Sequence, residues 1–219
     1  MRAVIFANGV FSHPEIDRTR LRPDDWLIAA DGGARHCQTL GLTPAVLIGD
    51  FDSIKIQERQ ALEQQGVTVV PFPESKDETD LELALRYAVE GGVNEVLILA
   101  GLGSRWDQSL ANLLIPAMVE LAGVQVRLID GPQEAALVRN GETLKLQGRP
   151  GDKVSLIPLG GDAHGVTTHG LEYPLQEDTL YFGATRGVSN ILLAEEATIH
   201  LERGIMACFI IHPSQKLDV

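Results

Sequence analysis

Short apolar runs recur along the first part of the chain, separated by mixed polar and apolar segments. Each run predicts a buried strand, because short apolar stretches bounded by turn residues are typical of strands covered on both faces. Strands that are joined by helices are expected to lie parallel in one sheet. The predicted strands span residues 3–7, 26–30, 45–48, 67–70, 95–100 and 125–129.

The pattern changes beyond about residue 131, where helical periodicity fades and short alternating runs take over. Asn140-Gly141 lies between two such runs and predicts a β-hairpin. We therefore expect an α/β domain with a mostly parallel sheet over residues 1–131, followed by a β-sandwich domain over residues 132–219. The strand candidates of this second part are residues 136–138, 143–146, 154–158, 165–168, 179–182, 197–201 and 205–211.

Composition narrows the class of protein. A formal net charge of -12 over 219 residues argues against nonspecific binding to nucleic acid or to an anionic membrane. The cysteines, Cys37 and Cys208, form no CxxC motif, so neither a disulfide scaffold nor a thiolate metal site is expected. The sequence shows no signal-peptide pattern and no apolar run long enough to span a membrane. These features predict a cytoplasmic protein.

Asp50 and Asp52 follow the third predicted strand and lie two residues apart in Gly49-Asp50-Phe51-Asp52-Ser53. On an extended backbone, side chains two residues apart point the same way, so both carboxylates can face one point. Like charges held that close repel unless a cation lies between them, and carboxylate oxygens suit Mg2+. The alternative is a solvated acidic turn, since Asp and Gly favour turns.

Asp31, Gly32 and Gly33 follow the second predicted strand. Open α/β sheets bind their ligands at the carboxyl ends of the strands, and glycines let a ligand approach the backbone closely. A tight strand-to-helix turn explains the same residues without any ligand.

Lys76, Asp77 and Asp80 gather before a helix whose start is marked by Thr79 and Glu82, which fit a capping box. The helix dipole favours acids at this end of a helix. It disfavours a lysine there unless an anion, such as a bound phosphate, lies beside it.

A glycine-rich segment, Gly101-Leu102-Gly103-Ser104-Arg105-Trp106-Asp107, follows the fifth predicted strand. It is neither a Walker A motif nor a dinucleotide fingerprint. Arg105 offers a fork of donors that suits phosphate. In the helix that follows, Pro116 cannot donate to the carbonyl of Asn112, so we expect a kink near Asn112.

Parallel strands share one edge for their carboxyl ends, so these polar motifs should converge there. Carboxylates, a lysine and an arginine around glycine loops predict a site for Mg2+ and a polyphosphate, and hence phosphoryl-type transfer.

In the second part of the chain, Thr185-Arg186-Gly187-Val188-Ser189-Asn190 combines short donor and acceptor side chains with a glycine. The alternative is an ordinary β-turn, which the local residues by themselves favour. The aromatic residues Tyr173, Tyr181 and Phe182 are expected in the core, and His164, His169 and His200 show no metal-ligand spacing.

These five motifs, in this order and over nearly the whole chain, resemble thiamine pyrophosphokinases. The resemblance implies an α/β catalytic domain followed by a β-sandwich domain, in a homodimer. It also implies transfer of the pyrophosphoryl group of ATP to the hydroxyl of thiamine, giving thiamine diphosphate and AMP. One departure is Ser104, where many relatives have a third glycine.

The same resemblance implies roles for single residues. Mg2+ would be bound by Asp50, Asp52 and Asp80, and these acids together with Asp107 would form the catalytic group. Ser189 and Asn190 would recognise thiamine across the dimer, with Tyr181 or Phe182 as the stacking aromatic. The residues implied in binding ATP are Asp31, Gly32, Gly33, Lys76, Asp77, Gly101, Gly103, Arg105 and Asn112.

Two other functions compete with this interpretation. The catalytic half could serve a pyrophosphokinase that acts on another small alcohol, such as a hydroxymethylpterin. The chain could also be a non-catalytic sensor of a nucleotide or of thiamine diphosphate, although its intact acidic and basic residues argue against that.

Overall fold

The computed structural model describes residues 1–213 of the chain. The chain divides into two compact units, Met1–Gly131 and Pro132–Val219, called here the N-terminal and C-terminal units. Among the described residues, no helix is both long enough and apolar enough to cross a membrane.

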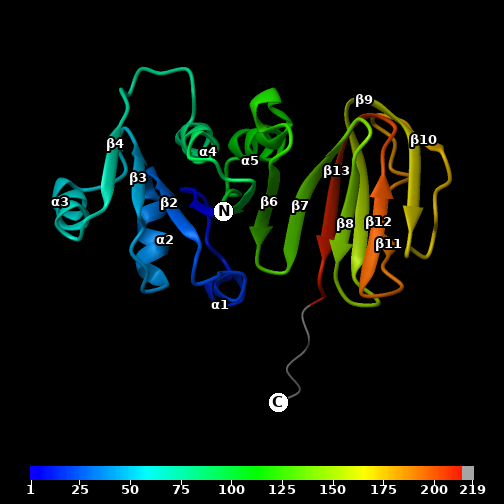
Figure 1. The fold of residues 1–219 in the computed structure, drawn as a ribbon, viewed down its shortest axis with the longest axis horizontal. Helices are drawn as coiled ribbons and strands as arrows, with labels where there is room; N and C mark the ends of the chain where they lie inside the picture. Colours follow the sequence, from blue (N-terminus) through cyan, green and yellow to red (C-terminus); the bar gives the residue numbers. More distant parts are fainter. Residues whose placement is uncertain (214–219) are drawn as a thin grey trace, which may run out of the picture. The chain divides into compact units, whose positions relative to one another are not determined.

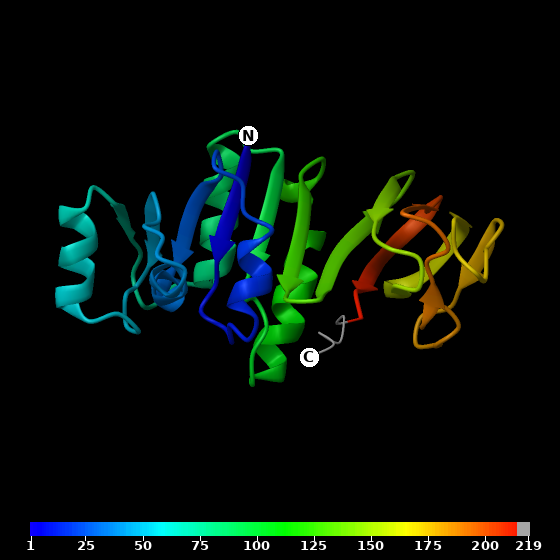
Figure 2. The same ribbon diagram turned by 90° about the horizontal axis from the view of Figure 1, so that it is seen from below.

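The N-terminal unit is built on a parallel sheet with the strand order β4-β3-β2-β1-β5-β6. Figures 1 and 2 show these strands side by side. In the centre of the sheet, Ile5 pairs with Ile28 on one side and with Ile98 on the other. The strands are β1 (Arg2–Phe6), β2 (Trp26–Ala30), β3 (Val46–Gly49), β4 (Thr68–Pro71), β5 (Glu95–Leu99) and β6 (Gln125–Asp130).

Helices connect these strands, as the sequence pattern predicts. Helix α4 begins where expected, because the Thr79 side chain accepts a hydrogen bond of 3.2 Å from the backbone N–H of Glu82. Its apolar stripe, which includes Leu81 and Leu85, is buried, and α4 contacts β1, β2 and β3. The helices are α1 (Pro14–Arg18), α2 (Ala34–Thr39), α3 (Ile56–Gln64), α4 (Asp80–Glu90) and α5 (Trp106–Leu114).

Helix α5 differs from the prediction at its carboxyl end. It stops at Leu114, and Pro116 lies in a separate 3-10 turn, Ile115–Ala117. The expected kink at Asn112 is therefore wrong. The helix ends at Leu114, two residues before the proline, and is not bent by it. Pro116 has no N–H to donate to the carbonyl of Asn112, so the α-helical hydrogen bonding ends here.

The C-terminal unit contains only strands and connections among its described residues, and the paired strands are antiparallel. Strand β13 pairs with β7 and with the first part of β9 in one sheet. Strand β12 pairs with β8 and with the last residues of β9 in a second sheet, and β10 and β11 also pair with β9. The predicted fold class, a parallel α/β unit followed by a strand-rich unit, is confirmed. The strands are β7 (Gln133–Arg139), β8 (Thr143–Gln147), β9 (Lys153–His169), β10 (Asp178–Leu180), β11 (Asn190–Ile191), β12 (Glu196–His200) and β13 (Arg203–Ile211).

The hairpin predicted around Asn140-Gly141 is wrong. Strand β7 pairs with β13, and β8 pairs with β12, so the turn joins two different sheets. Val138 and Leu146, on either side of the turn, both enter the same buried cluster. Burying both apolar faces against one core outweighs the local preference of Asn-Gly for direct pairing.

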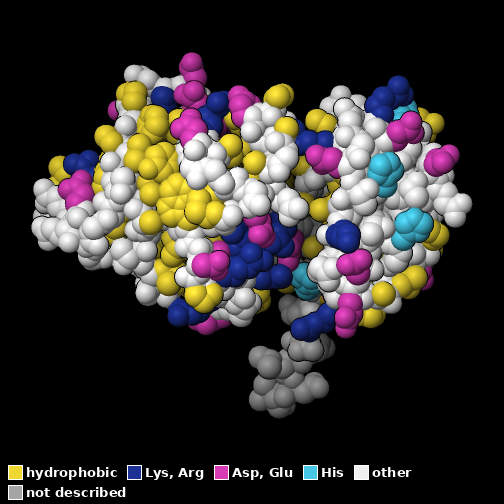
Figure 3. Space-filling view, viewed as in Figure 1, with side chains coloured by type: hydrophobic (Ala, Val, Ile, Leu, Met, Phe, Trp, Pro, Cys, Tyr) yellow, Lys and Arg dark blue, Asp and Glu magenta, His cyan; other side chains and the backbone are white. Residues whose placement is uncertain are grey.

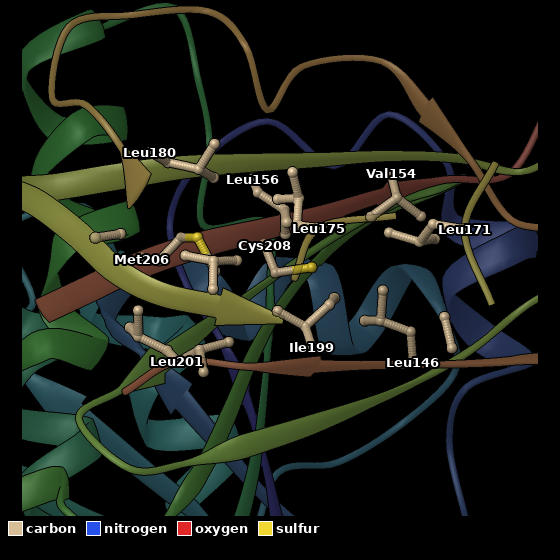
Figure 4. Packing of buried hydrophobic residues seen from close by; sticks show 14 of the residues in the cluster. Leu146, Val154, Leu156, Leu171, Leu175, Leu180, Ile199, Leu201, Met206 and Cys208 are labelled. Carbon is tan, nitrogen blue, oxygen red and sulfur yellow. The ribbon is translucent and has the colours of Figure 1, made fainter. Parts of the chain in front are cut away.

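Strand β9 is one long strand where the sequence suggests two. Its first half pairs with β13 and its last residues pair with β12, so β9 belongs to both sheets. Between the sheets lies an apolar cluster that includes Leu156, Ile199 and Met206 (Figure 4). This cluster is the core of the C-terminal unit.

The aromatic residues expected in this core are on the surface instead. The exposed fractions are 64% for Tyr173, 62% for Tyr181 and 61% for Phe182. Aliphatic residues fill the core without them, which leaves these rings available for contacts with other molecules.

Candidate active site

A cavity of about 580 Å³ opens at the carboxyl ends of the central strands of the N-terminal unit. It is lined by the loops that follow β1, β2, β3 and β5 and by the first turns of α4 and α5. The convergence expected of parallel strands therefore occurs. The site residues proposed from the sequence that line this cavity are Asp31, Asp50, Asp52, Asp80, Gly101, Gly103, Arg105 and Asn112.

Other residues proposed for the site lie outside the cavity lining. Lys76 does not line the cavity, but it forms ion pairs with Asp50 and Asp80, which do. Asp77 and Asp107 are exposed, and Asp107 forms an ion pair of 2.6 Å with Arg105 at the start of α5. Basic side chains bordered by acidic ones are also visible on the face shown in Figure 3.

Three carboxylates gather in the cavity. Asp31, Asp50 and Asp52 can each place one oxygen within 4.8 Å of the others. Asp50 and Asp52 come together through a turn, because Asp50 Oδ1 accepts a hydrogen bond of 3.2 Å from the Asp52 N–H. The extended backbone that we expected there is wrong, but the convergence of the two acids holds. Hard oxygen ligands at this spacing fit a divalent cation such as Mg2+.

Lys76 neutralises part of this acidic group. Its Nζ lies 2.7 Å from Asp50 Oδ2 and 3.1 Å from Asp80 Oδ1, and its side chain is 9% exposed. The hydrogen bond from Lys76 lowers the pKa of Asp50. Burial raises the pKa of Asp80, and the ion pair with Lys76 offsets only part of that effect. The two acids beside one lysine are therefore pushed in opposite directions, so Asp80 is the better proton acceptor.

Backbone strain is concentrated at the same edge of the sheet. Asp31, Phe51 and Ala100 have positive φ values of 46°, 65° and 52°, although none is a glycine. They follow β2, β3 and β5 respectively. Such conformations cost about 1 to 3 kcal/mol each and persist where the surroundings over-determine them, often at functional sites. The strain therefore supports a functional role for this edge.

Side chains of α5 hold the glycine-rich loop in place. Asn112 Nδ2 donates to the carbonyl of Gly101 at 2.6 Å. Ser109 Oγ accepts from the Gly103 N–H at 3.0 Å and donates to the Gly103 carbonyl at 3.1 Å. The loop is thereby fixed with its glycines facing the cavity. Asn112 acts here on the loop backbone, a role that the sequence alone did not suggest.

Asn8 and Ser53 line the cavity but were not predicted as site residues. Asn8 Nδ2 lies 3.2 Å from both Asp31 Oδ2 and Ser53 Oγ, and Ser53 donates to Asp52 Oδ1 at 2.9 Å. Asn8 follows β1, the strand between β2 and β5. Its position directly after the first predicted strand, residues 3–7, was the available signal.

Gly32 and Gly33 are explained by packing within the protein. A Cβ atom on Gly32 would lie 2.1 Å from Asn8 Oδ1, and one on Gly33 would lie 1.9 Å from the carbonyl oxygen of Phe6. At Gly33 the clash is with the backbone, so glycine is required, whereas a Cβ at Gly32 would displace the Asn8 side chain. The observation supports the strand-to-helix turn, the alternative that needs no ligand at these residues.

In the C-terminal unit, Asn190 is bound to the backbone of Tyr173. Its Nδ2 donates to the Tyr173 carbonyl at 2.7 Å, and its Oδ1 accepts from the Tyr173 N–H at 3.0 Å. The neighbouring Ser189 has a φ of 65°, and its N–H donates to Ser155 Oγ. The motif is thus a rigid turn that also fixes the segment carrying an exposed tyrosine.

Comparison with protein families assigns both units. The family model described as thiamin pyrophosphokinase, catalytic domain, matches residues 18–127. The model described as thiamin pyrophosphokinase, vitamin B1 binding domain, matches residues 142–206. The chain belongs to the thiamine pyrophosphokinase family. The resemblance inferred from the five sequence motifs is therefore confirmed.

Individual members of the family are similar over most of the chain. The thiamine pyrophosphokinase of Bacillus subtilis is 31% identical over 179 residues, which cover 82% of this chain and 84% of the relative. A crystal structure of thiamine pyrophosphokinase from Bacillus subtilis superposes with a TM-score of 0.87 at 26% identity, covering 98% of this chain and all of that one. One from Geobacillus thermodenitrificans has a TM-score of 0.85 at 24% identity, over 99% of this chain and all of that one, and shows the shared fold.

Proposed function

We propose that this protein transfers the pyrophosphoryl group of ATP to the hydroxyl of thiamine, forming thiamine diphosphate and AMP. Membership of the thiamine pyrophosphokinase family supports the reaction. The observation that carries it is the cavity in which Asp31, Asp50 and Asp52 converge beside the glycine-rich loop. The match to a vitamin B1 binding domain favours thiamine over a pterin alcohol.

The acidic group fits a magnesium ion. Asp50 and Asp52 are the central candidates for ligands, with Asp31 close enough to share the ion and Asp80 on the Lys76 side. When bound, Mg2+ would neutralise charge on the polyphosphate of ATP. The chain's own contribution is to hold the carboxylates in one place and, through the hydrogen bond from Lys76, to lower the pKa of Asp50.

ATP is the proposed co-substrate, and its phosphates would lie along the loop of Gly101 and Gly103. The start of α5 is at this loop, and backbone N–H groups at a helix N-terminus favour anions. Arg105 lies at the cavity wall with a largely exposed guanidinium, which can form two parallel hydrogen bonds to a phosphate.

In the proposed reaction the thiamine hydroxyl oxygen forms a bond to the β-phosphorus, and the bond between that phosphorus and the bridging oxygen of AMP breaks. The hydroxyl proton must pass to a carboxylate. Asp52 and Asp80 line the cavity and can accept it, whereas Asp107 is exposed and paired with Arg105. Burial raises the pKa of Asp80, which favours this carboxylate as a proton acceptor.

Replacing each of these acids by asparagine separates the two acids that line the cavity from Asp107. We expect Asp80→Asn and Asp52→Asn to reduce AMP formation by about a hundredfold or more, in line with general-base catalysis. Asp107→Asn should retain most of the activity. Equal losses in all three variants would contradict the assignment of a single base.

The C-terminal unit is the proposed source of thiamine recognition. Ser189 offers a hydroxyl, and Tyr173 offers an exposed ring on a segment whose backbone Asn190 holds in place. An aromatic face attracts the cationic thiazolium and stacks on the pyrimidine. We place Tyr173 in this role ahead of Tyr181, because only Tyr173 is tied to the Ser189-Asn190 motif by hydrogen bonds that the structure describes.

A homodimer is part of the proposal. Trp106, Leu110 and Leu114 form an apolar stripe on α5 at helical spacing, and Trp106 is 87% exposed. Water-exposed apolar stripes of this kind mark interaction surfaces, and a second copy of the chain would cover this one. Sedimentation of the wild type and of Trp106→Glu tests it, because the variant should shift toward the monomer.

The decisive measurement is AMP release from ATP and Mg2+, with and without thiamine, followed by mass analysis of the product. Thiamine-dependent AMP together with thiamine diphosphate is expected. ADP in place of AMP would mean a simple kinase. Turnover with a hydroxymethylpterin but not with thiamine would favour the other alcohol, and ATP binding without any turnover would favour a sensor.

A further inference from the structure

Asn8 connects two of the acids in the cavity. One side-chain nitrogen, Nδ2, reaches Asp31 Oδ2 and Ser53 Oγ, both at 3.2 Å. Ser53 passes the connection on, because its hydroxyl donates to Asp52 Oδ1 at 2.9 Å. An amide nitrogen carries two hydrogens, so both contacts can be satisfied at once. The loops after β1, β2 and β3 are thus joined by one directed series of hydrogen bonds.

The orientation of the Asn8 amide follows from its neighbours. Turning the amide over would place Oδ1 against the Asp31 carboxylate, where two acceptors would repel. With Nδ2 facing Asp31, one oxygen of each acid is held by a donor. The other oxygen of Asp31, Oδ1, is buried and has no hydrogen-bond partner among the described residues. An ionised oxygen in that situation requires a cation or a donor from a ligand.

Gly32 provides the space that Asn8 needs. A Cβ atom at residue 32 would lie 2.1 Å from Asn8 Oδ1 and 2.5 Å from its Cγ. Any other residue at this position would therefore displace the Asn8 side chain. Gly32, which follows Asp31 in the sequence, thus leaves room for Asn8, which follows strand β1.

We propose that Asn8 is a positioning residue, which orients Asp31 directly and Asp52 through Ser53 so that their remaining oxygens can bind a divalent cation. The inference rests on the proposed metal site and adds a specific role for Asn8, Ser53 and Gly32. Residues that orient metal ligands through hydrogen bonds typically change metal affinity by about 10- to 100-fold when they are replaced. Asn8 would act on the metal and not on thiamine.

The test measures Mn2+ affinity of the full chain, by the electron paramagnetic resonance signal of the free ion. The protein is saturated with α,β-methylene-ATP, in which a methylene group replaces the oxygen between the α- and β-phosphorus, so the pyrophosphoryl group cannot be transferred. Asn8→Leu keeps the size of the side chain but removes the donors, and it should weaken Mn2+ binding at least tenfold. Gly32→Ala should reproduce this loss, and Ser53→Ala should give a smaller one. Asn94→Leu, at the exposed amino end of β5, is the matched control and should bind as the wild type does.

The outcomes distinguish a failure of the positioning role of Asn8 from a failure of the proposed metal site. If the wild type binds Mn2+ and both Asn8→Leu and Ser53→Ala bind it within twofold of the wild type, the positioning role is wrong and the metal site stands. If the wild type itself does not bind Mn2+, the proposed metal site fails and this inference fails with it. Melting curves without metal identify variants with folding defects. Ser53→Ala, which removes only the hydroxyl between Asn8 and Asp52, carries the test if Asn8→Leu does not fold. Steady-state kinetics of Asn8→Leu add a second readout. KM for thiamine should stay unchanged in this variant, because Asn8 acts on the metal and not on thiamine.

Discussion

The side-chain amide of Asn190 forms two hydrogen bonds with the backbone of Tyr173, at 2.7 Å to its carbonyl and 3.0 Å from its N–H. Through these two bonds Asn190 holds the tyrosine segment in place, and they use one of the two hydrogens on Nδ2. The tyrosine ring is left 64% exposed. The motif that resembles a thiamine-recognition sequence thus fixes the backbone of an aromatic residue located 17 positions earlier.

Tyr173→Ala is expected to raise KM for thiamine about tenfold, since a stacked or cation-contacting ring contributes on the order of 1 to 2 kcal/mol. Tyr173→Phe should retain the wild-type value. Steady-state AMP formation at varied thiamine concentration measures both. Tyr181→Ala is the matched comparison and should change KM little. A rise in Tyr181→Ala without one in Tyr173→Ala would return the stacking role to Tyr181.

Lys76→Met separates two roles of the buried lysine. If Lys76 competes with a metal ion for Asp50 and Asp80, its removal should tighten Mn2+ binding about tenfold in the absence of nucleotide, because a nearby positive charge disappears. If Lys76 also binds phosphate, KM for ATP should rise in the same variant. Titration with Mn2+ and steady-state kinetics supply the two numbers. Lys145→Met, on exposed β8, is the control, and unchanged values in both variants would leave Lys76 with neither role.

Arg105→Ala should raise KM for ATP without changing the melting temperature. The ion pair between Arg105 and Asp107 is largely exposed, and pairs of that kind add little to stability. Asp107→Asn frees the guanidinium and should leave KM for ATP the same or lower. A loss of stability in Arg105→Ala, with unchanged nucleotide binding, would show that the residue serves the fold instead of the substrate.

The parallel sheet and the convergence of its strand ends could be predicted because they follow from hydrophobic pattern and topology. Asp50, Asp52 and Asp80 were identified from their places after predicted strands or at a helix start, and the structure places them in one cavity. Where the expectation used local backbone geometry, it was less successful. The turn at Phe51 has a positive φ that no strand pattern indicates.

Long-range pairing explains what the sequence did not reveal. Asn8 contacts Asp31 and Ser53 only because β1, β2 and β3 lie side by side, and nothing in the local sequence around Asn8 specifies those partners. The Asn140-Gly141 turn has the residues of a hairpin, yet its flanking strands pair elsewhere. The sequence also does not show why a glycine is present. Gly32 leaves space for the Asn8 side chain, and a ligand is not needed to explain it.

Asp17 is a buried carboxylate away from the cavity, on helix α1. Its Oδ1 accepts a hydrogen bond of 2.9 Å from the N–H of Gly131, the last residue of the N-terminal unit. Burial raises the pKa of Asp17 from 3.8 to about 6; the Gly131 hydrogen bond works in the opposite direction, while nearby Asp130 adds to the rise. The folded state therefore binds this proton more tightly than the unfolded state does.

Stability is consequently expected to depend on pH in a defined direction. Below about pH 4 Asp17 is protonated in both states, and its contribution is fully present. As pH rises through about 6, ionisation of the buried acid lowers the free energy of unfolding by roughly 2 to 3 kcal/mol. Asp17→Asn keeps an acceptor for Gly131 and cannot ionise, so it should be more stable than the wild type at pH 7 and similar to it at pH 4. Urea denaturation across this range measures the difference, with Glu15→Gln on the exposed side of α1 as the control, and parallel curves for the wild type and Asp17→Asn would contradict the assignment.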